Sequence, residues 1–66
     1  MAGKPPITKE QARDNVEAII RIFDREGAMK VFAAGLEPST NMTNSARAVY
    51  RAALYRLEKQ ENANVL

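Results

Sequence analysis

The segment from Asn44 to Gln60 places apolar residues at helical spacing on two opposite sides, and this pattern limits the possible folds more than any other feature. The first side carries the larger set: Ala46, Val49, Tyr50, Ala53, Leu54 and Leu57. The second side carries Ala48, Ala52 and Tyr55. One apolar stripe is enough to pack a helix onto its own chain. The second stripe therefore predicts that this helix also contacts another surface.

A capping box predicts the start of an earlier helix. Thr8 and Gln11 have the spacing at which the threonine hydroxyl caps a backbone amide and the glutamine side chain reaches back. We expect this helix to run to about Glu26 and to stop at Gly27, because glycine tolerates the positive φ of a helix end. The expected inner face is apolar and consists of Ala12, Val16, Ile19, Ile20, Ile22 and Phe23.

A second, shorter helix is expected over residues 28–34, with Gly35 at its end. Its residues Met29 and Phe32 are expected to close one end of the core.

Residues 37–42 have the composition of a turn, with proline, serine, threonine and asparagine together. Thr43 is the expected N-cap of the last helix, and Asn41 and Asn44 are its alternatives. We expect this helix to end near Gln60.

These segments predict an all-α fold, namely an antiparallel helical hairpin of two long helices with a short middle helix. The expected domains are a disordered N-terminal arm at residues 1–7, a single helical domain at residues 8–60 and a frayed C-terminal tail at residues 61–66. No apolar run reaches the roughly 18 residues of a membrane span, and no signal-peptide pattern opens the chain, so we expect a cytoplasmic protein.

Size and composition favour association with a second copy. A chain of 66 residues buries only about 60% of its unfolded surface, so its stability is marginal. Small domains gain stability from disulfides, metals or oligomers. The chain has no Cys and no His, which are the residues of disulfides and of most zinc sites. Oligomerisation or unusually good helix packing remains. We expect no cofactor, no metal and a homodimer, with its interface at Ala48, Ala52 and Tyr55.

Basic residues border the second stripe. Arg47 and Arg51 lie one turn apart, and arginine binds carboxylates and phosphates well. The formal net charge is +2, which permits an anionic partner without requiring one. We expect contacts with a partner or an anion at Arg47, Arg51, Met42 and Ser45.

We interpret the chain as a small non-enzymatic interaction protein, of a size typical of accessory proteins of phages and mobile elements. It would bind a partner protein through the last helix or the turn at residues 37–42, and would occlude or sequester that partner. An enzyme is disfavoured, because Cys and His, the usual nucleophile and general base, are absent.

Two other functions fit the sequence. Residues 29–58 follow the order of a helix-turn-helix, and Ser45, Arg47 and Arg51 would face the DNA groove in a transcriptional regulator. The connection between its two helices is longer than the usual turn of about 3–4 residues. The third hypothesis is a sponge for a nucleotide or another small anion, held between subunits by Arg47 and Arg51.

Overall fold

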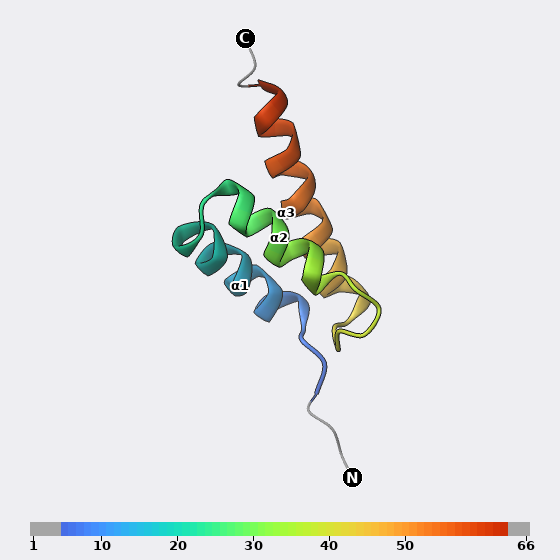
Figure 1. Cartoon of the computed structure of the whole chain (residues 1–66). Coiled ribbons are helices and arrows are strands. Elements are labelled where there is room, and N and C mark those ends of the chain that lie inside the picture. Colours follow the sequence, from blue (N-terminus) through green and yellow to red (C-terminus); the bar gives the residue numbers. More distant parts are fainter. Residues whose placement is uncertain (1–4, 64–66) are drawn as a thin grey trace.

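The computed structural model describes the backbone of residues 5–63 and the side chains of residues 5–60. Within that range it contains three α-helices, α1 (Lys9–Ile22), α2 (Arg25–Gly35) and α3 (Asn44–Ala63), as Figure 1 shows. The prediction of an all-α fold is confirmed. The predicted arm and tail extend into residues 1–4 and 64–66, which lie outside the described residues.

The segments that precede α1 and α3 are paired side by side. The Ile7 amide donates to the Asn41 carbonyl at 3.0 Å, and the Thr43 amide donates to the Ile7 carbonyl at 3.0 Å. This parallel bridge, between Ile7 and Met42, makes both helices start at the same end of the molecule.

The expected antiparallel hairpin of two long helices is therefore wrong in its pairing. Because α1 and α3 leave from one bridge, they run in the same general direction and diverge, while α2 returns in the opposite direction (Figure 1). Helix α3 packs against both other helices, and the contact between α1 and α2 is smaller.

The predicted start of α1 is confirmed, but its predicted end is wrong. The Thr8 hydroxyl accepts from the Gln11 amide at 3.3 Å, and the Gln11 side chain accepts from the Thr8 amide at 3.0 Å. The helix then ends at Ile22 rather than near Glu26, because Phe23 adopts extended backbone, with φ −103° and ψ 152°.

A second cap follows the break at once. The Asp24 carboxylate accepts from the Gly27 amide at 2.8 Å and starts α2. Gly27 thus lies in the first turn of α2 instead of ending α1, and no described glycine has a positive φ. Because of this cap, α2 begins at Arg25, three residues before the expected start at residue 28.

The predicted cap of α3 is confirmed. The Thr43 hydroxyl accepts from the Ala46 amide at 3.1 Å. The helix continues past the expected end at Gln60 and reaches Ala63.

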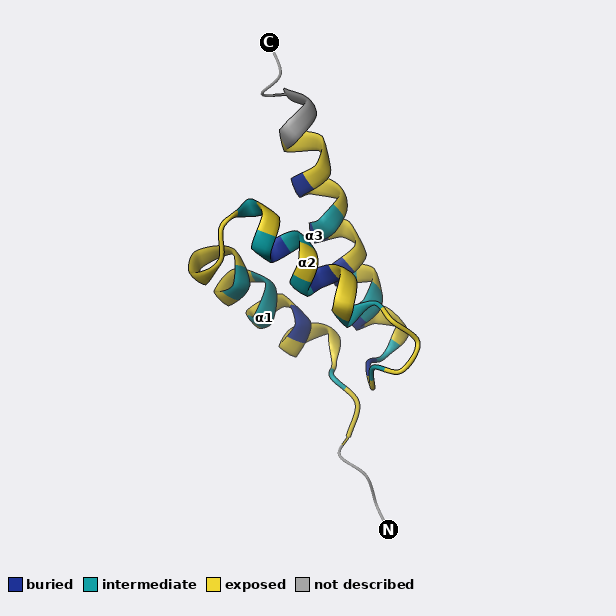
Figure 2. Ribbon diagram, viewed as in Figure 1, coloured by how far each residue is buried: buried dark blue, intermediate teal, exposed yellow. Residues whose placement is uncertain are grey.

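The core centres on two aromatic rings. Phe32 is fully buried, and its ring meets that of Tyr50 edge-on, with 5.4 Å between centroids and 68° between planes. Phe32 therefore lies at the centre of the core and not at one end. The first stripe of α3 is confirmed as its inner face: Ala46, Tyr50, Ala53 and Leu57 are buried, with Val49 and Leu54 packed against them (Figure 2).

The expected inner face of α1 is wrong in its last turn. Ile20, Ile22 and Phe23 are 49%, 74% and 44% exposed. Only Ala12 of α1 is buried, and Val16 and Ile19 pack beside the core, so the side of α1 that meets the core does not include Ile20, Ile22 or Phe23.

Candidate functional site

The α3 stripe, which consists of Ala48, Ala52 and Tyr55, lies on the side of α3 opposite the core. All three residues are exposed, and Tyr55 is 56% exposed. A tyrosine ring carries a large apolar area, which usually finds a partner in a folded protein. The fold of the chain therefore does not cover the α3 stripe, which the sequence predicted to contact another surface.

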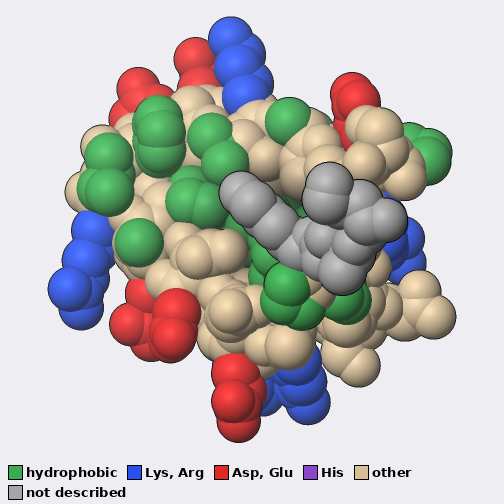
Figure 3. Space-filling model, turned by 90° about the horizontal axis from the view of Figure 1, so that it is seen from below, with side chains coloured by type: hydrophobic (Ala, Val, Ile, Leu, Met, Phe, Trp, Pro, Cys, Tyr) green, Lys and Arg blue, Asp and Glu red, His purple; other side chains and the backbone are tan. Residues whose placement is uncertain are grey.

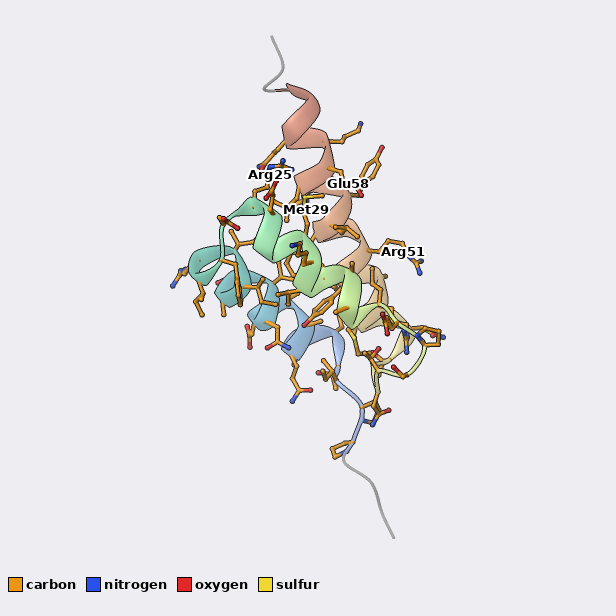
Figure 4. All side chains as sticks on the ribbon, viewed as in Figure 1. Arg25, Met29, Arg51 and Glu58 are labelled. Carbon is orange, nitrogen blue, oxygen red and sulfur yellow. The ribbon has the colours of Figure 1, made fainter. Side chains whose placement is uncertain are left out.

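Cations flank this stripe. The Lys59 ammonium lies 5.2 Å from the centroid of the Tyr55 ring, within the range of a cation–π contact. At about 100° per residue, Arg51 and Arg56 lie on opposite sides of the stripe. Figure 4 shows Arg51 projecting away from the helices. Arg56 and Lys59 are exposed as well.

A groove separates α1 from α3 and adjoins the stripe. This α1–α3 groove has a volume of about 350 Å³ and is lined by Arg13, Val16, Glu17, Val49, Ala52, Ala53 and Arg56. Val16 and Val49 are half-buried and Ala53 is buried, so the floor of the groove is apolar. Ala52 belongs both to the groove and to the α3 stripe, and therefore joins them into one surface.

Ile20 is an exposed apolar residue one turn beyond Val16, which lines the groove. It follows Val16 by four residues on α1, which places the two side chains on the same face of that helix. Helices α1 and α3 diverge from their common start (Figure 1). Seen from below, hydrophobic side chains lie at the left and around the centre of the molecule, and acidic and basic side chains project from its periphery (Figure 3).

The four residues expected to contact a partner or an anion do not form one site. Ser45 and Arg51 are exposed on α3, whereas Met42 is buried in the core beside the bridge to Ile7. Met42 thus serves packing and is not available as an adaptable contact.

Arg47 is occupied by the connection between α2 and α3. Its guanidinium donates to the carbonyl of Thr40 at 2.7 Å, and to those of Glu37 and Leu36 at 3.2 and 3.3 Å. The Thr40 hydroxyl closes the same turn, because its single proton is shared between the Gly35 and Glu37 carbonyls, each at 2.7 Å. Planar guanidinium donors suit such a set of carbonyls, so Arg47 fixes the turn.

A further cation is engaged between α2 and α3. The Arg25 guanidinium donates to the Leu57 carbonyl at 3.3 Å and to the Met29 sulfur at 3.2 Å, and Figure 4 shows Arg25 and Met29 together beside α3. Among the arginines of α2 and α3, the exposed Arg51 and Arg56 are therefore the ones that face outward near the stripe.

The sequence did not reveal the α1 side of the groove. The spacing of Arg13 and Glu17 puts both on one face of α1, together with Val16. Nothing in that spacing shows which helix this face meets, because the answer depends on the Ile7–Met42 bridge. The pairing of α1 with α3 also explains why Ala52 belongs both to the groove and to the α3 stripe.

Within the described residues, no helix combines the length and apolar character that crossing a membrane requires. The same residues contain no cluster of acidic side chains suited to holding a metal ion. Comparison of the chain with protein families, with curated proteins and with solved structures gave no match.

Proposed function

We propose that this chain is a non-enzymatic interaction protein that binds a partner protein and covers part of the partner's surface. One observation carries the proposal: the exposed α3 stripe continues through Ala52 into the apolar α1–α3 groove. Contiguous exposed apolar surface with a polar rim is typical of protein contact sites. Contact of this kind needs no reactive group, which fits a chain without Cys or His.

The test is affinity capture from the source cells with matched variants. Ala52→Glu places a charge at the junction of stripe and groove, and we expect it to lose a partner that the wild type retains. Ala18→Glu makes the same change at an exposed alanine of α1 outside the groove, and we expect it to retain that partner. Equal loss in both variants, or capture that neither affects, would overturn the proposal.

A homodimer is the second candidate occupant of the stripe. Ala48 and Ala52 lie one turn apart, and small residues at that spacing let two helices approach closely. The stripe is short, however, whereas stable interfaces contain about 20–30 residues on each side. Association through this stripe alone is therefore expected to be weak.

DNA binding and anion capture have less support from the geometry. Both hypotheses require a free Arg47, but its guanidinium donates to three carbonyls of its own chain. If α3 were a recognition helix, Ser45 and Arg51 would still be exposed polar residues in its N-terminal half. Binding of duplex DNA that weakens steeply with salt would favour the regulator over the interaction protein.

A further inference from the structure

The cations of this protein are concentrated on the helix that carries the stripe. Residues 44–60 contain four basic residues and one acidic residue, a balance of +3, whereas the whole chain carries +2. The basic residues are Arg47, Arg51, Arg56 and Lys59, and the acidic residue is Glu58. With Arg47 engaged by the turn, the remaining three are exposed around the stripe.

Cations also border the groove from both of its helices. Arg13 of α1 and Arg56 of α3 line it, and neither is engaged in a hydrogen bond or ion pair with a described residue. Glu17 is the one acidic residue in the lining. The rim of the surface is therefore mainly positive, with one negative position on the α1 side.

This charge pattern discriminates between occupants. Two copies joined at the α3 stripe would bring Arg51, Arg56 and Lys59 of each copy toward those of the other, and juxtaposed like charges oppose association. A partner with acidic residues would instead gain attraction from the same side chains. Complementary charge thus favours an acidic partner over a second copy.

The shape of the surface indicates a helix as the bound element. A groove between two helices accepts the apolar face of a third, whose anchors recur at i, i+3, i+4 and i+7. Val16 on α1 and Val49 and Ala52 on α3 provide apolar walls along the groove, and the exposed Ile20 follows Val16 by one turn. Its volume of about 350 Å³ lies near the lower limit for pockets that enclose a small molecule.

We propose that the α1–α3 groove and the α3 stripe together bind an amphipathic helix of another protein, whose apolar face is flanked by Asp or Glu. This inference rests on the proposed function and specifies the partner of the same surface. Carboxylates of the partner pair with Arg13 and Arg56, because a guanidinium can donate two hydrogen bonds to one carboxylate. Glu17 disfavours an acidic residue at the position that faces it and so selects one register of the bound helix.

The test uses three labelled synthetic peptides of about 18 residues, since shorter isolated helices are marginal in water. The first has leucines at helical spacing flanked by glutamates, the second has the same leucines flanked by lysines, and the third has the composition of the first with scrambled order. Fluorescence anisotropy measures binding to the full chain. We expect the first peptide alone to bind, and its affinity to fall as salt rises.

Paired variants assign the interaction to the groove. We expect Arg13→Glu with Arg56→Glu to weaken binding of the acidic peptide by about tenfold or more, and to create binding of the lysine peptide. Arg21→Glu, an exposed change on α1 outside the groove, leaves binding of the acidic peptide intact. Circular dichroism of each variant tests whether it retains the helical fold, which we expect of all of them.

The outcomes separate this inference from the proposed function. Equal binding of the acidic and scrambled peptides, no binding at millimolar protein, or no effect of the arginine variants would overturn the acidic-helix partner. If these peptides fail while Ala52→Glu still abolishes capture of a cellular protein, the proposed function stands and the partner's chemistry is different. Competition by duplex DNA at the groove, sensitive to the same arginines, would overturn both.

Discussion

The ring of Tyr50 lies directly against Gly35, so closely that a Cβ atom at Gly35 would be 2.6 Å from Cε2 of the ring. The ring cannot move aside easily, because it packs edge-on against Phe32 and its hydroxyl accepts from the Asn15 side-chain amide at 3.4 Å. Gly35 therefore allows the end of α2 to approach α3, and no positive φ is involved.

We expect Gly35→Ala to destabilise the fold by about 1–3 kcal/mol, the usual cost of overpacking a core. This direction opposes helix propensity, which favours alanine over glycine by about 1 kcal/mol within helices. Chemical denaturation measures the change. In a Tyr50→Ala background the same substitution should be neutral or stabilising, and an undiminished cost there would refute the proposed clash.

Arg47→Lys should destabilise the protein by about 1–3 kcal/mol, because lysine cannot reproduce the guanidinium bonds to the Leu36, Glu37 and Thr40 carbonyls. Hydrogen exchange should also accelerate in the turn between α2 and α3. Arg51→Lys is the matched control at an exposed site and should change stability by less than about 0.5 kcal/mol. Equal effects from the two variants would contradict a fixed role for Arg47.

Asp24→Ala should cost about 1 kcal/mol, since it removes the side-chain acceptor of the Gly27 amide. Thermal unfolding followed by circular dichroism measures this loss. Asp14→Ala, within α1 and exposed, serves as the control and is expected to have little effect. A cap at this position is not supported if the two variants are indistinguishable.

Self-association and partner binding should respond to salt in opposite directions. Light scattering of the wild type should show weak dimerisation that strengthens with salt, because screening relieves repulsion among Arg51, Arg56 and Lys59. Ala48→Glu combined with Ala52→Glu should leave a monomer at every salt concentration. A dimer that persists in this double variant would place the interface outside the α3 stripe.

Local signals in the sequence predicted the features that depend on neighbouring residues. The capping box at Thr8 and the cap at Thr43 each satisfy amides within the next turn, so a few residues define them. The inner face of α3 was also predictable, because one regular period extends through the whole helix. The break at Phe23 was missed because apolar spacing continues across it, although Asp24 is itself a strong cap residue.

The remaining features depend on pairing between distant segments. The sequence identifies Arg47 as a cation. It does not reveal the carbonyls around Arg47, because these come from the turn at residues 36–40. The groove likewise requires that α1 meet the flank of α3 next to Ala52. That arrangement follows from the bridge before the two helices, which involves only two backbone hydrogen bonds and has no residue pattern of its own.

The bridge between Ile7 and Met42 also bears on the order in which the chain assembles. Helices α2 and α3 are adjacent in sequence and meet after closing a short connection. The bridge closes a loop that spans residues 8–41, and the entropy lost in closing a loop increases with its length. We therefore expect α1 to dock last, onto an α2–α3 pair that has already formed, so that the groove is completed in the final step of folding.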